Sequence, residues 1–108
     1  MSDEYTIDMG DSSVAVRGIL RLESPDAYER ILGAVRARVL AAKEPLSLDV
    51  TAVTFMNSSG IRALGALVLA AKRAGARFTI RGTPSVPWQK KTLPSLGKLY
   101  AGVSVELE

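Results

Sequence analysis

The clearest pattern of hydrophobic and polar positions lies in the middle of the chain. An apolar run rich in β-branched residues ends abruptly at a polar turn, Asn57-Ser58-Ser59-Gly60. An alanine- and leucine-rich stretch with helical spacing follows directly and ends at Gly75. This pattern predicts a buried strand over 46–53 and a helix over about 59–74, joined by the polar turn.

The rest of the chain divides into similar segments. Residues 4–9 and 14–22 predict two strands, separated by a turn at 11–13. Ser24 and Pro25 are typical of an N-cap and a first helical position, so they open a helix that we expect to end near Lys43. Two further strands are expected over 77–81 and 103–107, with short helical pieces near 90–91 and 95–100. The predicted core-facing stripe of the first helix comprises Ala27, Ile31, Val35 and Val39.

The order of these elements defines the fold class. Helices that connect consecutive strands imply right-handed crossovers and parallel pairing. The continuous apolarity of 46–53 predicts that both faces of this strand are covered. We therefore expect a single α/β domain over 1–108, a small sandwich whose mixed, mostly parallel sheet has its helices mainly on one face.

Missing residue types exclude several kinds of chemistry. The 108-residue chain has no cysteine and no histidine. It therefore cannot form a thiol nucleophile, a Ser-His-Asp triad or the usual Cys/His zinc site. It also lacks the glycine-rich loops that bind phosphates in nucleotide-binding folds. We expect no enzyme activity, no catalytic residue, no cofactor and no metal site.

The positive charge of the chain is concentrated in its second half. The net charge is +3, and no acidic residue occurs between Val50 and Val105. This half would attract acidic proteins, nucleotides or anionic headgroups; alternatively, it is a solvated basic face. Lys90-Lys91 is too short to indicate a nucleic acid, and none is expected as a partner. The basic residues of this half are Arg62, Lys72, Arg73, Arg77, Arg81, Lys90, Lys91 and Lys98.

Two features bear on cellular location. No apolar stretch reaches the roughly 18–20 residues that span a bilayer, so membrane insertion is not expected. The acidic first residues lack the basic and apolar regions of a signal peptide. Together with the absence of cysteine, this predicts a cytoplasmic protein.

The predicted helix over 59–74 has two different faces. One face should pack on the sheet and comprises Ile61, Leu64, Val68 and Ala71. The outward face is charged at its ends and small or apolar between them, and it comprises Arg62, Ala66, Leu69 and Arg73. Such a surface suits a partner protein. Alternatively, the proline-rich segment around Trp88 covers it, and Trp88 either closes the core or anchors a partner.

The segment 48–64 resembles the core motif of STAS domains, most closely that of bacterial anti-sigma-factor antagonists. The likeness is carried by Leu48-Asp49-Val50 and by Val53-Thr54-Phe55-Met56-Asn57-Ser58-Ser59-Gly60-Ile61 with Leu64. In that family the serine after an acidic position is phosphorylated by an anti-sigma factor with a histidine-kinase-like ATPase fold. A serine phosphatase removes the phosphate. The unphosphorylated antagonist binds the anti-sigma factor, and the phosphorylated form releases it.

The resemblance therefore implies a STAS-like module of a partner-switching system. It makes Ser58 the phosphoacceptor, with Ser59 as the fallback, and it makes the kinase and the phosphatase the partners. A homodimer is left open. Combined with the outward helix face, it gives the expected partner-binding residues Asn57, Ser58, Ser59, Gly60, Arg62, Ala66, Leu69 and Arg73.

Two positions depart from the family pattern. Asn57 stands where the family has Asp, and Arg21 stands where an early Gly-x-Leu-Asp motif has its acidic residue. Asn still caps helices well, so we expect the turn to form, with Ser58 as a cap. Asp49, near a strand end, is expected to be a hydrogen-bonded structural carboxylate.

Two other functions fit the same residues. In a STAS subunit of an ABC-type lipid transporter, the same turn and helix would hold the ATPase, with the serines as contacts that carry no phosphate. In a nucleotide-sensing STAS domain, the basic half and the helix N-terminus would form an anion site.

Overall fold

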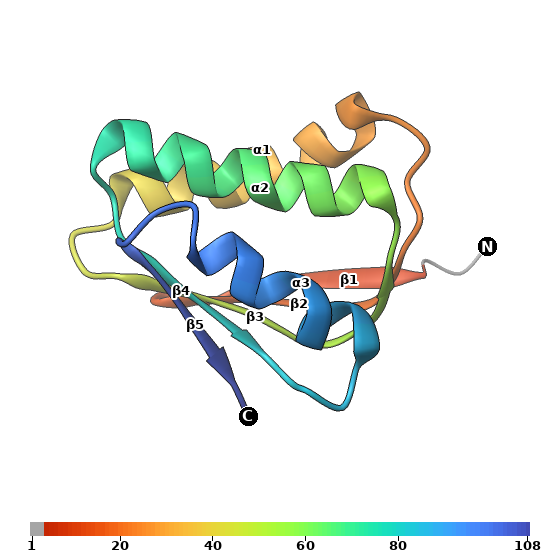
Figure 1. The fold of residues 1–108 in the computed structure, drawn as a ribbon. Coiled ribbons are helices and arrows are strands. Elements are labelled where there is room, and N and C mark those ends of the chain that lie inside the picture. Colours follow the sequence, from red (N-terminus) through yellow and green to blue (C-terminus); the bar gives the residue numbers. More distant parts are fainter. Residues whose placement is uncertain (1–3) are drawn as a thin grey trace.

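The computed structural model describes residues 4–108 as strands that alternate with helices (Figure 1). The strands are β1 (Tyr5–Met9), β2 (Ser13–Leu20), β3 (Leu46–Met56), β4 (Phe78–Gly82) and β5 (Val103–Leu107). The helices are α1 (Pro25–Ala41), α2 (Ser58–Ala74) and α3 (Pro87–Gly97). This confirms the predicted α/β class and the order of its elements.

The five strands form one sheet in the order β1-β2-β3-β4-β5. β1 and β2 are an antiparallel hairpin, whereas β2, β3, β4 and β5 pair in parallel. Each parallel connection passes through one of the three helices, which is the crossover that parallel neighbours require. The mixed, mostly parallel sheet predicted from the sequence is therefore confirmed.

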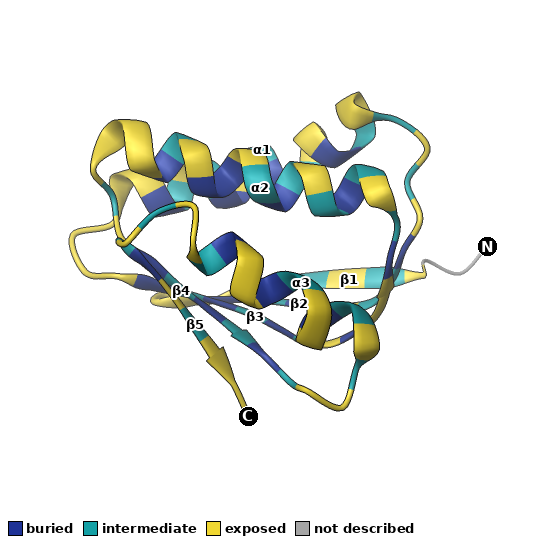
Figure 2. Ribbon diagram, viewed as in Figure 1, coloured by how far each residue is buried: buried dark blue, intermediate teal, exposed yellow. Residues whose placement is uncertain are grey.

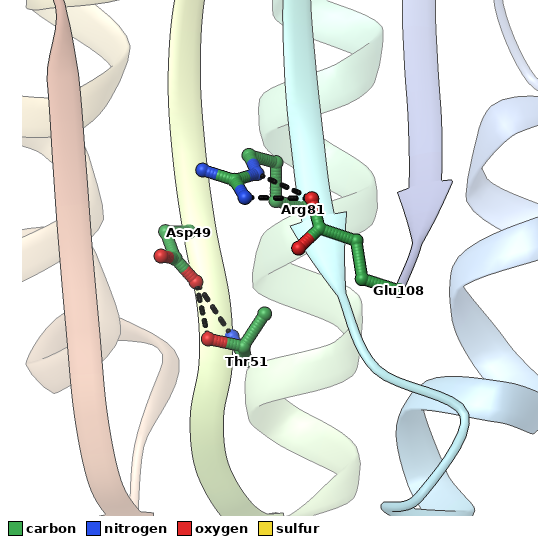
Figure 3. Close-up of polar contacts among 4 residues, drawn as sticks. All are labelled: Asp49, Thr51, Arg81 and Glu108. Atoms are coloured by element: carbon green, nitrogen blue, oxygen red, sulfur yellow. Dashed lines mark hydrogen bonds and ion pairs between the residues drawn. The ribbon is translucent and has the colours of Figure 1, made fainter.

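The helices cover one face of the sheet and leave the other open. α1 and α2 pack against each other above the strands, and their buried positions face the sheet (Figure 2). Seen from the open face, the helices lie behind the strands (Figure 3). Leu46, Leu48 and Val50 of β3 are buried beneath the helices, whereas the alternate residues are partly exposed. The prediction that both faces of β3 are covered is wrong.

β3 is longer and less regular than its sequence predicts. Ser13 to Leu20 of β2 lie opposite Ser47 to Met56 of β3, so 8 residues face 10 and β3 has register shifts. Its inward residues after Val50 are therefore three apart, not two, at Val53 and Met56. The alternation of inward and outward residues along β3 ends where this irregularity begins.

α3 supplies donors to β3 beyond the end of its pairing with β4. The last paired residue is Asp49. Nε2 of the buried Gln89 then donates to the carbonyls of Val50 (2.7 Å) and Val53 (2.9 Å). Nε1 of Trp88 donates to the Val53 carbonyl at 2.8 Å, and its ring packs against the core. Trp88 thus closes the core, as one of its two predicted roles requires.

α1 begins as predicted, but its buried stripe is different. The Ser24 side chain accepts a hydrogen bond from the Ala27 backbone N–H at 3.1 Å, and Pro25 is the first helical residue. The helix ends at Ala41, slightly before the predicted end. Ala27 and Ile31 are only partly buried. The buried set is instead Tyr28, Leu32, Val35 and Val39. At its start, the large ring of Tyr28 buries more apolar area than the Ala27 methyl group would.

α3 is one helix and not two short pieces. Pro87 occupies its first turn, where a missing N–H costs nothing, and Pro94 lies inside it. Pro94 leaves the Lys90 carbonyl without its helical donor; Lys90 is exposed, so that loss is tolerable. Among residues 4–108, none of the helices has both the length and the apolar composition needed to cross a membrane.

Candidate functional site

The turn between β3 and α2 is built around the Asn57 side chain. Its Oδ1 accepts a hydrogen bond from the Gly60 backbone N–H at 3.0 Å, which makes Asn57 the N-cap of α2. Its Nδ2 donates to the Leu22 carbonyl at 3.0 Å. Ser58 is therefore not the cap, as the sequence suggested, but the first residue of the helix. Asn57 occupies the cap position because its side-chain amide forms hydrogen bonds with backbone groups on both sides of the turn.

Tyr28 of α1 completes this hydrogen-bond network. Its hydroxyl lies 2.6 Å from Asn57 Oδ1 and 3.1 Å from the Leu20 carbonyl. The side chain is fully buried. The ordinary pKa of tyrosine, about 10, already keeps the hydroxyl protonated at neutral pH, and burial raises the pKa of Tyr28 further. The start of α1 thereby fixes the start of α2.

Position 60 requires glycine, because side chains of β3 and α1 leave no room there for a Cβ atom. A Cβ atom at this position would lie 2.5 Å from Met56 Cγ and 2.7 Å from the Tyr28 hydroxyl oxygen. Both distances are shorter than van der Waals contact. Any larger residue would force the side chain of Met56 or Tyr28 to shift.

The two serines have different surroundings. Ser58 is exposed at the first position of α2, where capping does not use its hydroxyl. Ser59 is half-buried and lines a groove between α1 and α2. The first turn of α2 has no acidic residue, so its positive dipole end faces no negative side chain of its own helix.

The groove between α1 and α2 has a volume of about 280 Å³. Arg62 and Ala66 of α2 lie along it, opposite Glu29, Leu32 and Arg36 of α1. Nη1 of Arg36 donates to Glu29 Oε2 at 3.0 Å. This hydrogen bond lowers the pKa of Glu29, so its carboxylate stays charged and paired.

The structure divides the predicted outward face of α2 into two parts. Arg62 and Ala66 are exposed at the groove, close to the serines. Leu69 and Arg73 lie farther along the helix and do not line the groove, and Leu69 is 39% exposed. The segment around Trp88 leaves these four residues exposed, so it does not cover the face as the alternative proposed.

Sequence reasoning missed the contribution of α1 to this site. Tyr28, Glu29 and Arg36 meet the turn and α2 only in the folded structure. A signal for Tyr28 did exist, because Tyr28, Leu32, Val35 and Val39 also follow helical spacing. The predicted stripe has Ala27 and Ile31 in place of Tyr28 and Leu32. Both stripes have helical spacing, so nothing in the sequence distinguished them.

Arg21 and Asp49 are both engaged elsewhere. Arg21 forms an ion pair with Glu4, with Nε 3.2 Å from Glu4 Oε2. Asp49 lies on the open sheet face, where its Oδ1 accepts from the Thr51 backbone N–H (2.9 Å) and Oγ1 (2.7 Å) (Figure 3). Asp49 is thus a structural carboxylate, as predicted, and lies on the face opposite the helices.

The open face around Asp49 carries paired charges. Arg81 lies directly across from Asp49 on β4 and binds Glu108 Oε1 through Nη2 at 2.6 Å (Figure 3). Burial opposes ionisation of Asp49, but the Thr51 hydrogen bonds and the charges of Arg81 and Arg17 outweigh it and lower the pKa of Asp49. Within residues 4–108, no cluster of potential ligands could hold a metal ion.

A one-sided α/β sandwich with a polar strand-to-helix turn is the arrangement of a STAS domain. Residues 4–97 match the family model described as "Mlab, STAS domain", and the chain belongs to this family. No curated protein matches the chain.

Two solved structures share the fold. A chain in the crystal structure of the diguanylate cyclase SiaD in complex with its activator SiaC, from Pseudomonas aeruginosa, is 16% identical. The match has a TM-score of 0.67 and covers 99% of this chain and 96% of that chain. An anti-sigma factor antagonist from Mycobacterium paratuberculosis is 22% identical, with a TM-score of 0.61 and coverage of 93% of this chain and 83% of that chain.

Proposed function

We propose that this STAS domain binds a partner of the histidine-kinase-like ATPase fold through the start of α2, and that phosphorylation of Ser58 releases the partner. The observation that carries this proposal is that different residues of the turn cap α2 and expose a hydroxyl. Asn57 caps the helix, so the exposed Ser58 hydroxyl is available for chemistry without loss of the fold. In this account the domain is a regulator without catalytic activity.

The free domain can accept a phosphate at this position. A phosphoserine adds about −1.5 to −2 charges. At a helix N-terminus such a charge gains about 0.3–1 kcal/mol from the dipole. Arg62 follows four residues later, on the same side of α2, and adds a favourable pair. Phosphorylation therefore leaves the isolated fold intact.

In a docked complex the same phosphate is unfavourable. Closure of an interface over Ser58 would remove water from a charged group, which costs several kcal/mol unless it is paired. Because each 1.4 kcal/mol changes an affinity about tenfold, this penalty is enough to dissociate the partner. The switch requires no refolding of either protein.

The two structural neighbours support binding to another protein. One is an anti-sigma factor antagonist, and the other occurs in a complex of an enzyme with its activator. By analogy with the first, we propose that the partner is an anti-sigma factor that phosphorylates Ser58, that a serine phosphatase resets the switch, and that the protein regulates transcription in the cytoplasm.

A second candidate is permanent docking to an ATPase, as in the transporter alternative. The neutral Asn57 favours it, because no carboxylate stands in the turn beside Ser58 where the family pattern has one. Nucleotide sensing has less support. The groove beside the site measures about 280 Å³, at the lower limit of the roughly 300–1,000 Å³ typical of ligand pockets.

Phosphorylation can be tested by intact-mass measurement. The protein is incubated with Mg-ATP and a cognate anti-sigma factor kinase, alongside the S58A and S59A variants. We expect wild type and S59A to gain one phosphate and S58A to gain none. A gain that persists in S58A and disappears in S59A would move the switch to Ser59. No gain in any variant would refute the switch and favour permanent docking.

A further inference from the structure

The groove between α1 and α2 is continuous with the proposed switch site. Ser59 lines it and is the direct neighbour of Ser58. A protein that binds at Ser58 is therefore next to the groove. Its lining combines apolar side chains, among them Leu32 and Leu67, with the small residues Ala63 and Ala66.

The charges around the groove do not cancel. Glu29 is paired with Arg36 across its α1 side. Arg62 forms no ion pair with any residue of the described chain, 4–108. No acidic residue occurs anywhere in α2. The groove therefore presents one positive charge that lacks a counter-charge, over an apolar floor.

The size of the groove limits what can enter it. A volume of about 280 Å³ is too small for a helix and is at the lower limit of ligand pockets. It is appropriate for an anchoring side chain, the kind of group that dominates binding energy when it fills a pocket at an interface.

We propose that this groove is a socket for one apolar side chain of the protein partner, and that a carboxylate next to that side chain in the partner pairs with Arg62. The inference rests on the proposed function, since the partner is the protein that approaches Ser58. It adds a second contact to the one at Ser58. It also adds α1 to an interface that the sequence assigned to the turn and α2 alone.

The chemistry of the socket can be tested on the protein without its partner. The probe is phenylbutyrate, which combines an apolar group with a carboxylate, and phenylbutylamine is its oppositely charged control. In ¹H–¹⁵N NMR titrations we expect saturable phenylbutyrate shifts at groove residues, with a dissociation constant on the order of 1 mM. R62A should weaken binding about threefold, and A66M should abolish it by filling the groove.

Matched controls lie on the same helix outside the groove. R73A removes the same charge as R62A, and A74M adds the same side chain as A66M at an exposed position. Both controls should bind phenylbutyrate like wild type. In the phosphorylation assay, A66M should slow modification of Ser58 relative to A74M.

Four results would overturn the socket. Equal binding of the amine would remove the role of charge, and shifts that survive in A66M would place the probe elsewhere. Unchanged phosphorylation of A66M, or Arg62-dependent binding to anionic vesicles in place of phenylbutyrate, would show that the partner does not use the groove. None of these results refutes the phosphorylation of Ser58, and the NMR shifts test the socket even where phosphorylation fails.

Discussion

The Tyr28 hydroxyl donates to Asn57 Oδ1 over 2.6 Å, which joins the first turn of α1 to the cap of α2. The same oxygen of Asn57 accepts the Gly60 N–H, so one atom organises both helix starts. The exposed Ser58 lies between these fixed residues. The geometry of the proposed switch is therefore set by a buried network and not by the serine itself.

Removal of the Tyr28 hydroxyl should loosen this network. We expect Y28F to lower the free energy of unfolding by about 1 kcal/mol, because Asn57 loses one buried donor and keeps the other. Urea denaturation measures the change. Y5F is the matched control, since Tyr5 is half-buried on the edge strand, and it should change stability by less than about 0.5 kcal/mol. Equal effects of the two variants would contradict the role of the hydroxyl.

Restoration of the family's acidic residue should be unfavourable in this chain. In N57D a carboxylate oxygen replaces the amide that donates to the Leu22 carbonyl. The lost hydrogen bond costs more than the roughly 0.3–1 kcal/mol that the helix dipole returns to an acidic cap. We expect a net loss of about 1 kcal/mol at pH 7 in urea denaturation. An N57D protein as stable as wild type would show that the bond to Leu22 contributes little.

Two glycines of α2 provide an internal comparison. A Cβ at Gly60 would approach Met56 Cγ to 2.5 Å, whereas a Cβ at Gly65 would meet nothing closer than 3.9 Å. We expect G60A to destabilise the protein by about 1–3 kcal/mol through overpacking. G65A should stabilise it by up to about 1 kcal/mol, because alanine restricts the unfolded chain. Thermal unfolding measures both, and similar losses in the two variants would contradict the close packing around Gly60.

The sequence was sufficient for the order of the elements and for the turn at 57–60. The apolar run, the polar turn and Gly75 act on their own segment of the chain, so their effect does not depend on tertiary contacts. The outward position of Arg62, Ala66, Leu69 and Arg73 also followed from helical spacing alone. These features could be predicted without knowledge of the tertiary contacts.

The features that the sequence did not reveal depend on tertiary contacts. Ser58 and Asn57 are both acceptable caps, and the choice between them depends on Tyr28 and the Leu22 carbonyl. The irregularity of β3 lies in its pairing with β2, and a donor from α3 binds the Val50 carbonyl there. Its apolar composition alone suggested a strand covered on both sides.

Asp49 should make stability depend on pH. The pKa of Asp49 lies below its ordinary value of 3.8 in the folded protein, so the unfolded chain binds the proton more readily. Its contribution is complete above about pH 4, near the unfolded value, and is lost as the pH falls through the lower folded pKa.

D49N and T51V test this pH dependence. D49N should be less stable than wild type by up to about 1 kcal/mol at pH 7, and the difference should shrink as the pH falls below about 4. T51V should reduce the same dependence, because the Thr51 hydroxyl is one of the donors to Asp49. Urea denaturation between pH 7 and pH 2.5 gives these curves. A constant gap between wild type and D49N across that range would contradict the assignment.

A phosphate on Ser58 should act on the interface and not on the fold. The direct measurement compares the affinity of the ATPase partner for unmodified protein and for protein with phosphoserine genetically encoded at position 58, by isothermal titration calorimetry. We expect phosphoserine to weaken binding by about 100-fold or more, with a melting temperature equal to or slightly above that of the unmodified protein. Equal affinities would contradict the account, and so would a phosphoprotein that loses binding because it has unfolded.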